Sequence, residues 1–452
     1  MRLEIRHWKF AALGALSVAA ASIGFASPGT ARPTKPKVLY VFCAQDSCRD
    51  GSHPSGDLII DSAQALYGTT TMGGQFGAGT VYKIIHNTVT GTHRHIVLYD
   101  FCNNIGCADG GQPVAGTLIL DTDGSLYGTA SMGGPTGGTD GAGVVYKLTP
   151  NAHHTAYTYS ILYNFCRTGG CTDGMTPTGN LTYAGAASGA LYDKTSPLYG
   201  STVGGGGHNA GVVFSLTPQT GGTMKEVPLY FFCSKGGSNT CSDGKNPNGG
   251  IGIDDNGNIG GTTALGGNSN AGLVFRLTPS GKVRWTETVL HAFCAAANCP
   301  DGMSPGFGVQ IDRFGNIFGT TTAGGNTNAA CGAQGCGVAF KIDPNGVLTQ
   351  LHAFCSDDPC SDGGLPARLT VDTFGNPVGM TRAGGKSGAG TLYQMNNGFQ
   401  VLTDFKCKTN KCVLGEAPDG GITADANNNL YGTLSERGRN NGGSVFTYAP
   451  MP

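Results

Sequence analysis

Two sets of aspartates recur along the chain and are the first side chains to consider for chemistry. Members of the first set lie in a Cys-x-Asp-Gly motif, and carboxylates that converge in a folded protein can hold a cation such as Ca²⁺. Aspartate beside glycine is also typical of a tight turn, in which the carboxylate accepts backbone N–H hydrogen bonds. Because the motif repeats in almost every unit, the turn explains it better than a metal site does. The metal candidates are Asp50, Asp109, Asp173, Asp243, Asp301 and Asp362, and the last copy, "CVLGEAPDGG", lacks this residue.

The second set of aspartates ends a short apolar run in each repeat. That run lies between the two sets, so we expect the sets at opposite faces of the molecule. "DTDGS" and "DDNGN" at two of these positions lack the later ligands of a calcium loop, which argues against an EF-hand site. The second set consists of Asp61, Asp121, Asp254, Asp312, Asp372 and Asp425, with Ala184 at the corresponding place in the third copy.

The 16 cysteines fall into adjacent pairs, most of them separated by four residues. An exported chain meets an oxidising compartment, so local disulfides are the natural prediction. Zinc is the alternative, but it needs a second pair or histidines close by, and these pairs are about one repeat apart. Each small loop closure stabilises the fold by about 2 kcal/mol at most. The predicted disulfides join Cys43 with Cys48, Cys102 with Cys107, Cys166 with Cys171, Cys233 with Cys241, Cys294 with Cys299, Cys331 with Cys336, Cys355 with Cys360, and Cys407 with Cys412.

No catalytic constellation stands out in the sequence. There is no Gly-x-Ser-x-Gly elbow and no phosphate-binding loop, and the 10 histidines do not cluster by spacing. A nucleophilic cysteine is not expected because every cysteine has a neighbour for pairing. We therefore predict no catalytic residues and no cofactor, and the sequence does not identify a binding residue.

One phrase recurs seven times and defines the elements that position these residues. It begins as "LYGTTTMGG" at Leu66 and "LYGTASMGG" at Leu126, and ends as "LYGTLSERG" at Leu430. An apolar run precedes each copy ("DLIID", "TLILD", "RLTVD"), and two more follow it ("GTVYKI", then "IVLYDF"). Four short runs rich in β-branched and aromatic residues, separated by Gly, Asn and Asp, indicate four β-strands per unit of about 60 residues.

The ends of the chain predict how these units are arranged. The first run after residue 37 is an isolated fourth run, Val38–Phe42, whereas the last unit has only its first three runs. A ring explains this split because the N-terminal strand can complete the last sheet and remove its open edge. We therefore predict an all-β, seven-bladed β-propeller of four-stranded antiparallel blades. Two units depart from the pattern, with an insertion from Ala184 to Pro197 and an extra pair, Cys331 with Cys336.

The N-terminus predicts export. A basic start precedes an apolar stretch from Phe10 to Ala26 and then small residues, as in a cleaved signal peptide. A membrane-spanning helix is the alternative, but the stretch is short and interrupted by glycine. We expect a signal peptide at 1–31, a propeller at 32–452, no transmembrane segment in the mature chain, and a secreted or periplasmic location. A formal net charge of −1 with 13% charged residues does not favour nucleic acid as a partner.

The repeat resembles that of the GloVer tandem-repeat proteins, a bacterial family named after Gloeobacter and Verrucomicrobia. The motif stands here as "DGGQPVAGTLILDTDGSLYGTASMGG…GVVYKLTP", and the resemblance covers Val38 to Pro450. It implies an exported protein without an established activity. Some relatives carry a C-terminal sorting signal, which we do not find after Tyr448, and we do not assign the cysteine pairs to the family pattern.

These observations leave three hypotheses for function. The first is a binding or interaction module that presents its loops and channel to an unknown protein or glycan. The second is a propeller enzyme of lyase or lactonase type with a metal in the central channel. It requires asymmetric His, Asp or Glu in the channel, whereas the channel-side runs consist mostly of Gly, Leu, Ile, Val and Thr. The third is a surface-layer or matrix protein.

Overall fold

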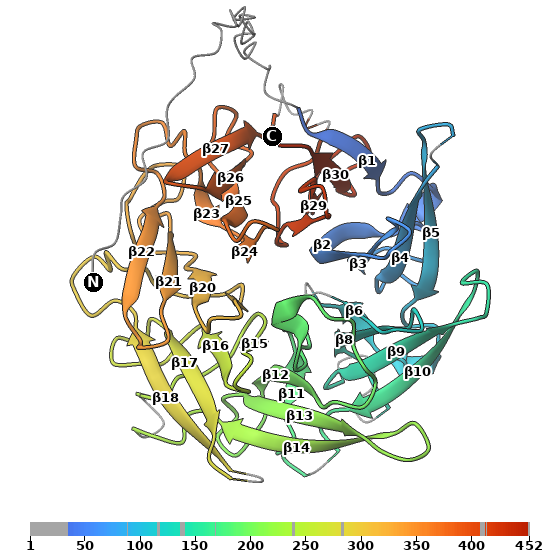
Figure 1. Ribbon diagram of the computed structural model, residues 1–452, viewed down its shortest axis with the longest axis horizontal. Helices are drawn as coiled ribbons and strands as arrows, with labels where there is room; N and C mark the ends of the chain where they lie inside the picture. The colour runs from blue at the N-terminus through green and yellow to red at the C-terminus, as the bar shows by residue number, and fades with distance from the viewer. Residues whose placement is uncertain are drawn as a thin grey trace, which may run out of the picture.

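The chain forms a seven-bladed β-propeller, as predicted (Figure 1). The computed structural model describes residues 35–450 except 88, 115–117, 136–140, 168, 237–239, 282–283, 407–411 and 413. The predicted signal peptide at 1–31 lies outside the described residues. Within the described part of the chain, no helix is long and apolar enough to cross a membrane.

Each blade is an antiparallel sheet whose strands follow one another from the centre of the ring outward. Blade one consists of β2 (Ser52–Ile60), β3 (Leu66–Met72), β4 (Thr80–His86) and β5 (His93–Asp100). In blade two, β6 (Gly111–Pro113) and β7 (Ile119–Leu120) both pair with β8 (Leu126–Met132), followed by β9 (Val144–Pro150) and β10 (Tyr157–Asn164). Blade three contains β11 (Met175–Pro177), β12 (Leu198–Gly204), β13 (Val212–Pro218) and β14 (Met224–Phe231).

The remaining blades repeat this order. Blade four contains β15 (Gly252–Ile253), β16 (Ile259–Thr263), β17 (Leu273–Pro279) and β18 (Trp285–Ala292), and blade five contains β19 (Val309–Ile311), β20 (Ile317–Thr320), β21 (Val338–Ile342) and β22 (Leu348–Ala353). In blade six, β23 (Gly364–Pro366) and β24 (Thr370–Val371) pair with β25 (Pro377–Ala383), followed by β26 (Thr391–Met395) and β27 (Phe399–Asp404). Blade seven contains β28 (Thr423–Ala424), β29 (Leu430–Leu434), β30 (Ser444–Tyr448) and β1 (Lys37–Val41). Short 3₁₀ turns are η1 (Asp46–Cys48), η2 (Ile105–Cys107) and η4 (Ala186–Ser188).

The N-terminal strand closes the ring. β1 pairs antiparallel with β30, with Val38 opposite Phe446 and Val41 opposite Ser444. Figure 1 shows this blue strand beside the dark red strands of the last blade. The prediction that Val38–Phe42 completes blade seven is therefore confirmed, and the last blade has no open outer edge at β30.

Aromatic pairs hold neighbouring blades together. The phenylalanine that follows each outer strand packs against an aromatic ring on the third strand of the next blade, with ring centroids 5.0–5.4 Å apart. Glycine in the "LYG" phrase makes room for that ring, since a Cβ at Gly68 would overlap the Tyr82 side chain. Such pairs contribute about 0.5–1.5 kcal/mol each beyond the area they bury. The pairs are Phe42–Tyr82, Phe101–Tyr146, Phe165–Phe214, Phe232–Phe275, Phe293–Phe340, Phe354–Tyr393 and Phe405–Phe446.

The innermost strand begins earlier than the apolar run predicts. In blade one, β2 starts at Ser52 in the "DG…P" segment, and Ser52 and Pro54 lie opposite Met72 and Thr70 of β3. Its register shifts between Ser55 and Ile59, so one strand is paired in two parts. The polar "DG…P" segment therefore belongs to the sheet, a role that its composition does not indicate.

Candidate functional site

The first set of aspartates fixes the loops that connect one blade to the next. Asp50 is buried and accepts hydrogen bonds from the Tyr40 hydroxyl at 2.7 Å and from the N–H groups of Ala44 and Gln45 at 3.0 and 3.2 Å. These two residues lie inside the Cys43–Cys48 loop, so the carboxylate ties the disulfide loop to strand β1. The carboxylate oxygens of Asp50 already accept three hydrogen bonds. Few of their lone pairs therefore remain for binding a cation.

The same contact recurs with tyrosine or histidine as the donor. Tyr99 donates to Asp109 at 2.6 Å, and His352 Nε2 lies 2.8 Å from Asp362. Burial, together with the hydrogen bond to Asp109, raises the pKa of Tyr99 above its usual value, so the hydroxyl keeps its proton and remains a donor. The other contacts of this kind are Tyr163–Asp173, Tyr230–Asp243 and His291–Asp301.

The second set of aspartates caps the turns between the first two strands of every blade except blade three, where Ala184 stands in place of aspartate. Asp121 Oδ1 accepts the N–H groups of Asp123 and Ser125 at 2.9 and 2.8 Å, and Asp254 makes the same pair of bonds. This is the geometry of an Asx-type turn. The two sets lie at opposite ends of the innermost strands, since Asp50 precedes β2 and Asp61 follows it.

Disulfides join seven of the cysteine pairs within the described residues. The joined pairs are Cys43 with Cys48, Cys102 with Cys107, Cys166 with Cys171, Cys233 with Cys241, Cys294 with Cys299, Cys331 with Cys336, and Cys355 with Cys360.

Two points of the cysteine prediction need separate comment. Cys412 is disulfide-bonded, but Cys407 lies outside the described residues, so the predicted bond between Cys407 and Cys412 stays a prediction. The expectation that the pairs stay about one blade apart is wrong in one place, where the extra pair, Cys331 with Cys336, lies against Cys355 and Cys360. The blade-five loop reaches blade six there, a contact that spacing along the chain does not reveal.

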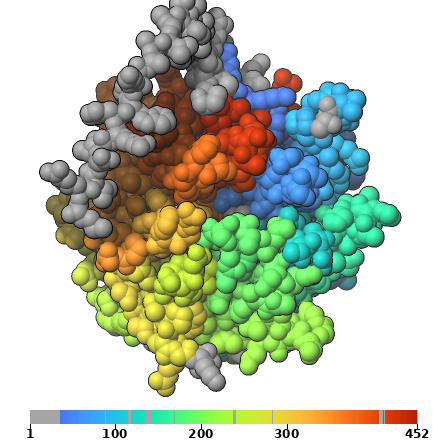
Figure 2. All heavy atoms as spheres, in the orientation of Figure 1, coloured from blue at the N-terminus to red at the C-terminus, as the bar shows by residue number. Residues whose placement is uncertain are grey.

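The central channel holds a cavity of 470 Å³ lined by the innermost strands. The blade-three insertion lines it too, through Ala186, Ala187 and Leu191. Figures 1 and 2 show this green segment reaching toward the centre of the ring and covering part of the hollow there. We call residues 184–197 the lid. Its anchor is Tyr192, which is fully buried and donates its N–H to Leu120 O at 3.2 Å.

A buried polar cluster crosses the channel and breaks the sevenfold pattern. Arg368 Nη1 lies 3.2 Å from Asp57 Oδ2 and 3.3 Å from Asn180 Oδ1. Asp57 also accepts the N–H of Gly421 at 2.6 Å. These residues come from blades one, three, six and seven, so the cluster joins distant parts of the chain. We call Asp57, Asn180 and Arg368 the channel cluster.

Glycines at the equivalent positions of other blades leave room for the channel cluster. A Cβ at Gly250 would overlap Asn180 Oδ1, and one at Gly421 would lie 2.7 Å from Asp57 Oδ1. A buried ion pair is costly to desolvate, so it persists only where hydrogen bonds satisfy its remaining groups. Arg368 Nε is the exception, because within the described residues it is buried without a hydrogen-bond partner.

The rest of the cavity wall combines aliphatic and uncharged polar side chains. Ile59, Ile119 and Ile311 contribute apolar surface, while Gln310 and Thr423 contribute hydrogen-bonding groups. Among the described residues that line it, the only carboxylates are Asp57 and Asp372, and none is a histidine.

Both carboxylates of the cavity wall are already engaged. Asp57 pairs with Arg368, and Asp372 accepts the N–H groups of Phe374 and Asn376 and a hydrogen bond from Gln394 Nε2 at 2.6 Å. The cavity can therefore offer apolar contacts and neutral hydrogen bonds, and its described wall lacks a free charged group for acid–base chemistry.

The sequence identified the aspartates and cysteines but missed the channel cluster. Asp57, Asn180 and Arg368 each begin a "DLIID"-type run whose first residue is Gly in three other units. The available signal was a polar residue at an aligned position where three units have glycine and the second copy has Thr117.

Comparisons with known proteins agree with the repeat and the fold. The model of the Gloeobacter/Verrucomicrobia repeat matches residues 24–197 and 186–393. No curated protein is similar enough in sequence to match. Among solved structures, the extracellular domain of the hybrid two-component system BT4673 from B. thetaiotaomicron is similar, with a TM-score of 0.51 and 12% identity over 91% of this chain. The match spans 39% of that protein's chain, and at this identity it supports the fold alone.

Other solved structures are more distant. The β-propeller domain of the trilobed protease from Pyrococcus furiosus is 8% identical, with a TM-score of 0.42, and the match covers 88% of this chain and 93% of that one. Trypanosoma rangeli sialidase is 10% identical, with a TM-score of 0.42, over 81% of this chain and 57% of the sialidase.

Proposed function

Because the chain belongs to the Gloeobacter/Verrucomicrobia repeat family, whose repeat it carries in two tandem regions, we propose that it is an exported binding module with its ligand site in the central cavity. The described disulfides support an oxidising compartment outside the cytoplasm, in line with the predicted signal peptide. Binding is the role that the observed cavity serves best.

The channel cluster is the observation that carries this proposal. It is polar and buried, and it contains the one ion pair between described residues of the cavity wall. The cavity volume of 470 Å³ lies in the range of small-molecule sites, which are mostly apolar with a few fixed polar groups.

The ligand class that fits is the end of a neutral glycan. A sugar ring has apolar C–H faces for the isoleucines and hydroxyls for Gln310 and for the Thr423 oxygen, whose own proton is donated to Leu58 O. Because Asp57 neutralises Arg368, the floor of the cavity does not demand an anionic ligand. A protein partner would contact the blade faces instead, outside this cavity.

The alternative is an enzyme of lyase or lactonase type with a metal in the channel. That chemistry requires free carboxylates or histidines that converge on one point. Both carboxylates on the described cavity wall are occupied by arginine, amide and backbone partners. We therefore favour binding over catalysis.

Calorimetric titration with a panel of neutral and anionic oligosaccharides tests the proposal. Gln310→Ala should weaken the binding of a neutral sugar by about 3- to 10-fold, since one hydrogen bond contributes about 0.5–1.5 kcal/mol net. The matched control is Gln400→Ala, which removes the same side chain from the exposed face of β27. Binding that is equally strong in both variants, or turnover of a lactone substrate with stoichiometric metal, would overturn the proposal.

A further inference from the structure

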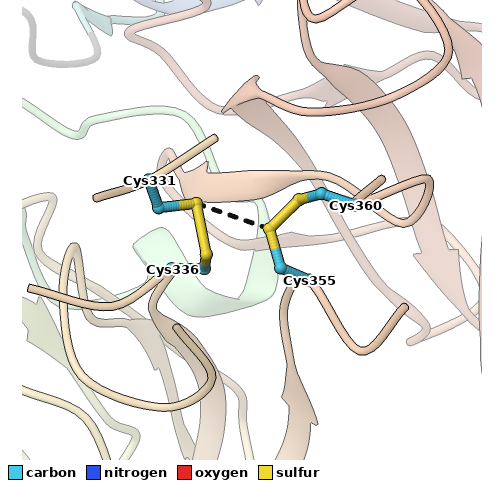
Figure 3. Close-up of side chains that lie close together, drawn as sticks. All are labelled: Cys331, Cys336, Cys355 and Cys360. Atoms are coloured by element: carbon cyan, nitrogen blue, oxygen red, sulfur yellow. Dashed lines mark hydrogen bonds between the residues drawn. A yellow bond between two sulfur atoms is a disulfide. The ribbon is translucent and has the colours of Figure 1, made fainter. Parts of the chain in front are cut away.

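Four sulfur atoms converge between blades five and six. The Sγ atoms of Cys331, Cys336, Cys355 and Cys360 all lie within 4.8 Å of one another, and three of the four residues are buried. Figure 3 shows the two disulfides side by side, with Cys331 Sγ 3.4 Å from Cys355 Sγ. We call these residues the sulfur cluster. Among the described residues it is the one group of this composition compact enough to hold a metal ion.

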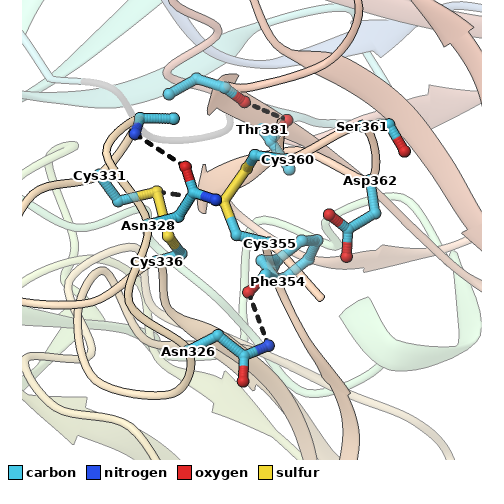
Figure 4. Close-up of a disulfide and its surroundings, with 12 residues drawn as sticks. Asn326, Asn328, Cys331, Cys336, Phe354, Cys355, Cys360, Ser361, Asp362 and Thr381 are labelled. Carbon is cyan, nitrogen blue, oxygen red and sulfur yellow. Dashed lines mark hydrogen bonds between the residues drawn. A yellow bond between two sulfur atoms is a disulfide. The ribbon is translucent and has the colours of Figure 1, made fainter. Parts of the chain in front are cut away.

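The surrounding residues are arranged to bring the extra pair to this place. Asn326 Nδ2 donates to Ala353 O at 3.1 Å and to Phe354 O at 3.0 Å, which fastens the blade-five loop to the end of β22 (Figure 4). Cys336 O accepts the N–H of Leu365 at 2.8 Å, so the loop also binds the start of blade six. The insertion is therefore held at both sides of the cluster.

Gly364 leaves the space that the sulfurs fill. A Cβ on this residue would collide with Cys331 Sγ and lie 3.0 Å from Cys355 Sγ. Gly364 has no positive φ, so its backbone does not demand glycine. Met175, Lys245 and Met303 occupy the corresponding position in three other units. Gly111 stands at the same position in the second copy, so the glycine does not by itself mark a second cysteine pair, but here its missing side chain leaves the room that Cys331 Sγ occupies.

The extra pair also differs from the ordinary pairs in its backbone. Cys355 and Cys360 have positive φ, as do both cysteines of the ordinary pairs in the first five copies, whereas Cys331 and Cys336 do not. The extra pair is therefore not another copy of the same turn. The extra pair places two more sulfur atoms beside the two of the repeated pair, Cys355 and Cys360.

We propose that the sulfur cluster is a zinc site when its disulfides are reduced. Tetrahedral Zn²⁺ with Zn–S bonds of about 2.3 Å needs sulfurs about 3.8 Å apart, a separation compatible with this cluster. Two pairs from two loops, each with four intervening residues, supply the four ligands. The oxidised chain holds two disulfides, and the reduced chain binds one zinc ion through four thiolates.

The conversion balances with a dithiol as the reductant. Each cystine takes up two electrons and two protons, and the dithiol leaves as its own disulfide. One Zn²⁺ then replaces four thiol protons and forms four Zn–S bonds. Each of the two disulfides lies within one loop, whereas the zinc joins the blade-five loop to the loop that leads into blade six.

Zinc content after reduction tests this site. The full chain is treated with a phosphine or dithiol under anaerobic conditions, supplied with Zn²⁺, and passed over a desalting column. We expect one zinc per chain in the natural protein and none in the double variant Cys331→Ser with Cys336→Ser. The matched control, Cys294→Ser with Cys299→Ser, removes an ordinary pair and should retain one zinc.

A second measurement does not depend on any variant. Zinc should protect the four cysteines of the sulfur cluster from alkylation in the natural protein, whereas Cys43 and Cys48 react at the same rate with and without the metal. Reduced protein that binds no zinc, protection that is uniform over all cysteines, or equal zinc in the double variant of Cys331 and Cys336 would each overturn the proposal.

Discussion

The recurring aspartates work as buried hydrogen-bond acceptors, and the sequence contains a sign of this role. The unit that lacks the Cys-x-Asp-Gly aspartate also has Thr403 where the other copies have tyrosine or histidine. Donor and acceptor are therefore lost together in one copy. A metal ligand would not require an aromatic hydroxyl or imidazole as its partner, whereas a hydrogen bond does.

Asp50→Ala tests this role. The substitution leaves the Tyr40 hydroxyl and two N–H groups without an acceptor, and we expect the free energy of unfolding to fall by about 3 kcal/mol. Asp46→Ala is the matched control, since Asp46 is exposed in the same loop. Chemical denaturation measures both. If a chelator, rather than Asp50→Ala, destabilised the protein, the carboxylates would be metal ligands.

His95 makes stability depend on pH. Its ring stacks on Tyr40 with centroids 4.3 Å apart, and burial lowers its pKa to about 4. The unfolded chain, with a histidine pKa near 6.5, binds more protons than the native chain between these values. Stability therefore falls as pH decreases from 6.5 toward 4.

His95→Tyr should remove the pH dependence that this histidine causes, while the ring at position 95 still stacks on Tyr40. Tyr159 occupies the equivalent place in blade two and stacks on Tyr99 at 4.2 Å, so a tyrosine fits there. We expect the stability lost between pH 7 and pH 4.5 to shrink by about 2 kcal/mol, as measured by denaturation at both pH values. His208→Tyr, at an exposed residue, should leave the profile unchanged. An unaltered profile in His95→Tyr would contradict the assignment.

Glu226 has the opposite pH dependence. Burial, and then the nearby charge of Asp173, raise the pKa of Glu226 to about 8. The native chain keeps this proton where the unfolded chain loses it, so stability falls as pH rises from about 4.5 to 8. Glu226→Gln should raise the thermal midpoint at pH 8 and leave it unchanged at pH 4. A midpoint that shifts equally at both pH values would exclude a titration effect.

At the scale of the element, two segments depart from the repeated blade and each has a structural task. β1 supplies the outer strand of blade seven, and Phe42 then packs on Tyr82 of blade one. The lid supplies a cover over the channel, which the described residues of the other blades do not. It replaces the Asx turn at the position where Ala184 stands in place of aspartate.

Tyr192 should control how firmly the lid is held. It packs between Tyr127 and Tyr183, with centroids 5.2 Å from each, and its hydroxyl donates to Ser196 O at 2.7 Å. In Tyr192→Ala we expect limited proteolysis to cut within the lid several-fold faster, because local opening no longer breaks these contacts. Leu191→Ala, at a half-exposed neighbour, is the control. Equal cleavage in both variants would show that Tyr192 does not anchor the lid.

At the scale of the whole molecule, the ring was predictable because its signal is repeated. The same pattern recurs seven times: an apolar run, the "LYG"-type phrase, and a run with an aromatic residue. The unit that is split between the two ends of the chain indicates that the ring is closed. The aromatic pairs between blades follow from the same residues. Each blade meets its neighbour through a similar contact, so seven blades close without a specialised interface.

Features that occur once were not predictable from the repeat. Arg368 and Asp57 are 311 residues apart (368 − 57), and only the closed ring brings them together. The sulfur cluster likewise depends on a loop of blade five reaching blade six, a contact that pair spacing alone does not give. Sequence periodicity determined the scaffold, whereas these sites depend on how blades meet in three dimensions.

Hydrogen–deuterium exchange with and without a bound neutral oligosaccharide tests the central claim most directly. A ligand in the channel should slow exchange in the innermost strands, at 57–60 and 309–311, and in the lid, while the outer strands β5 and β18 stay unchanged. Protection confined to outer strands or to the inter-blade loops, with the channel strands unaffected, would contradict the assignment of the cavity as the binding site.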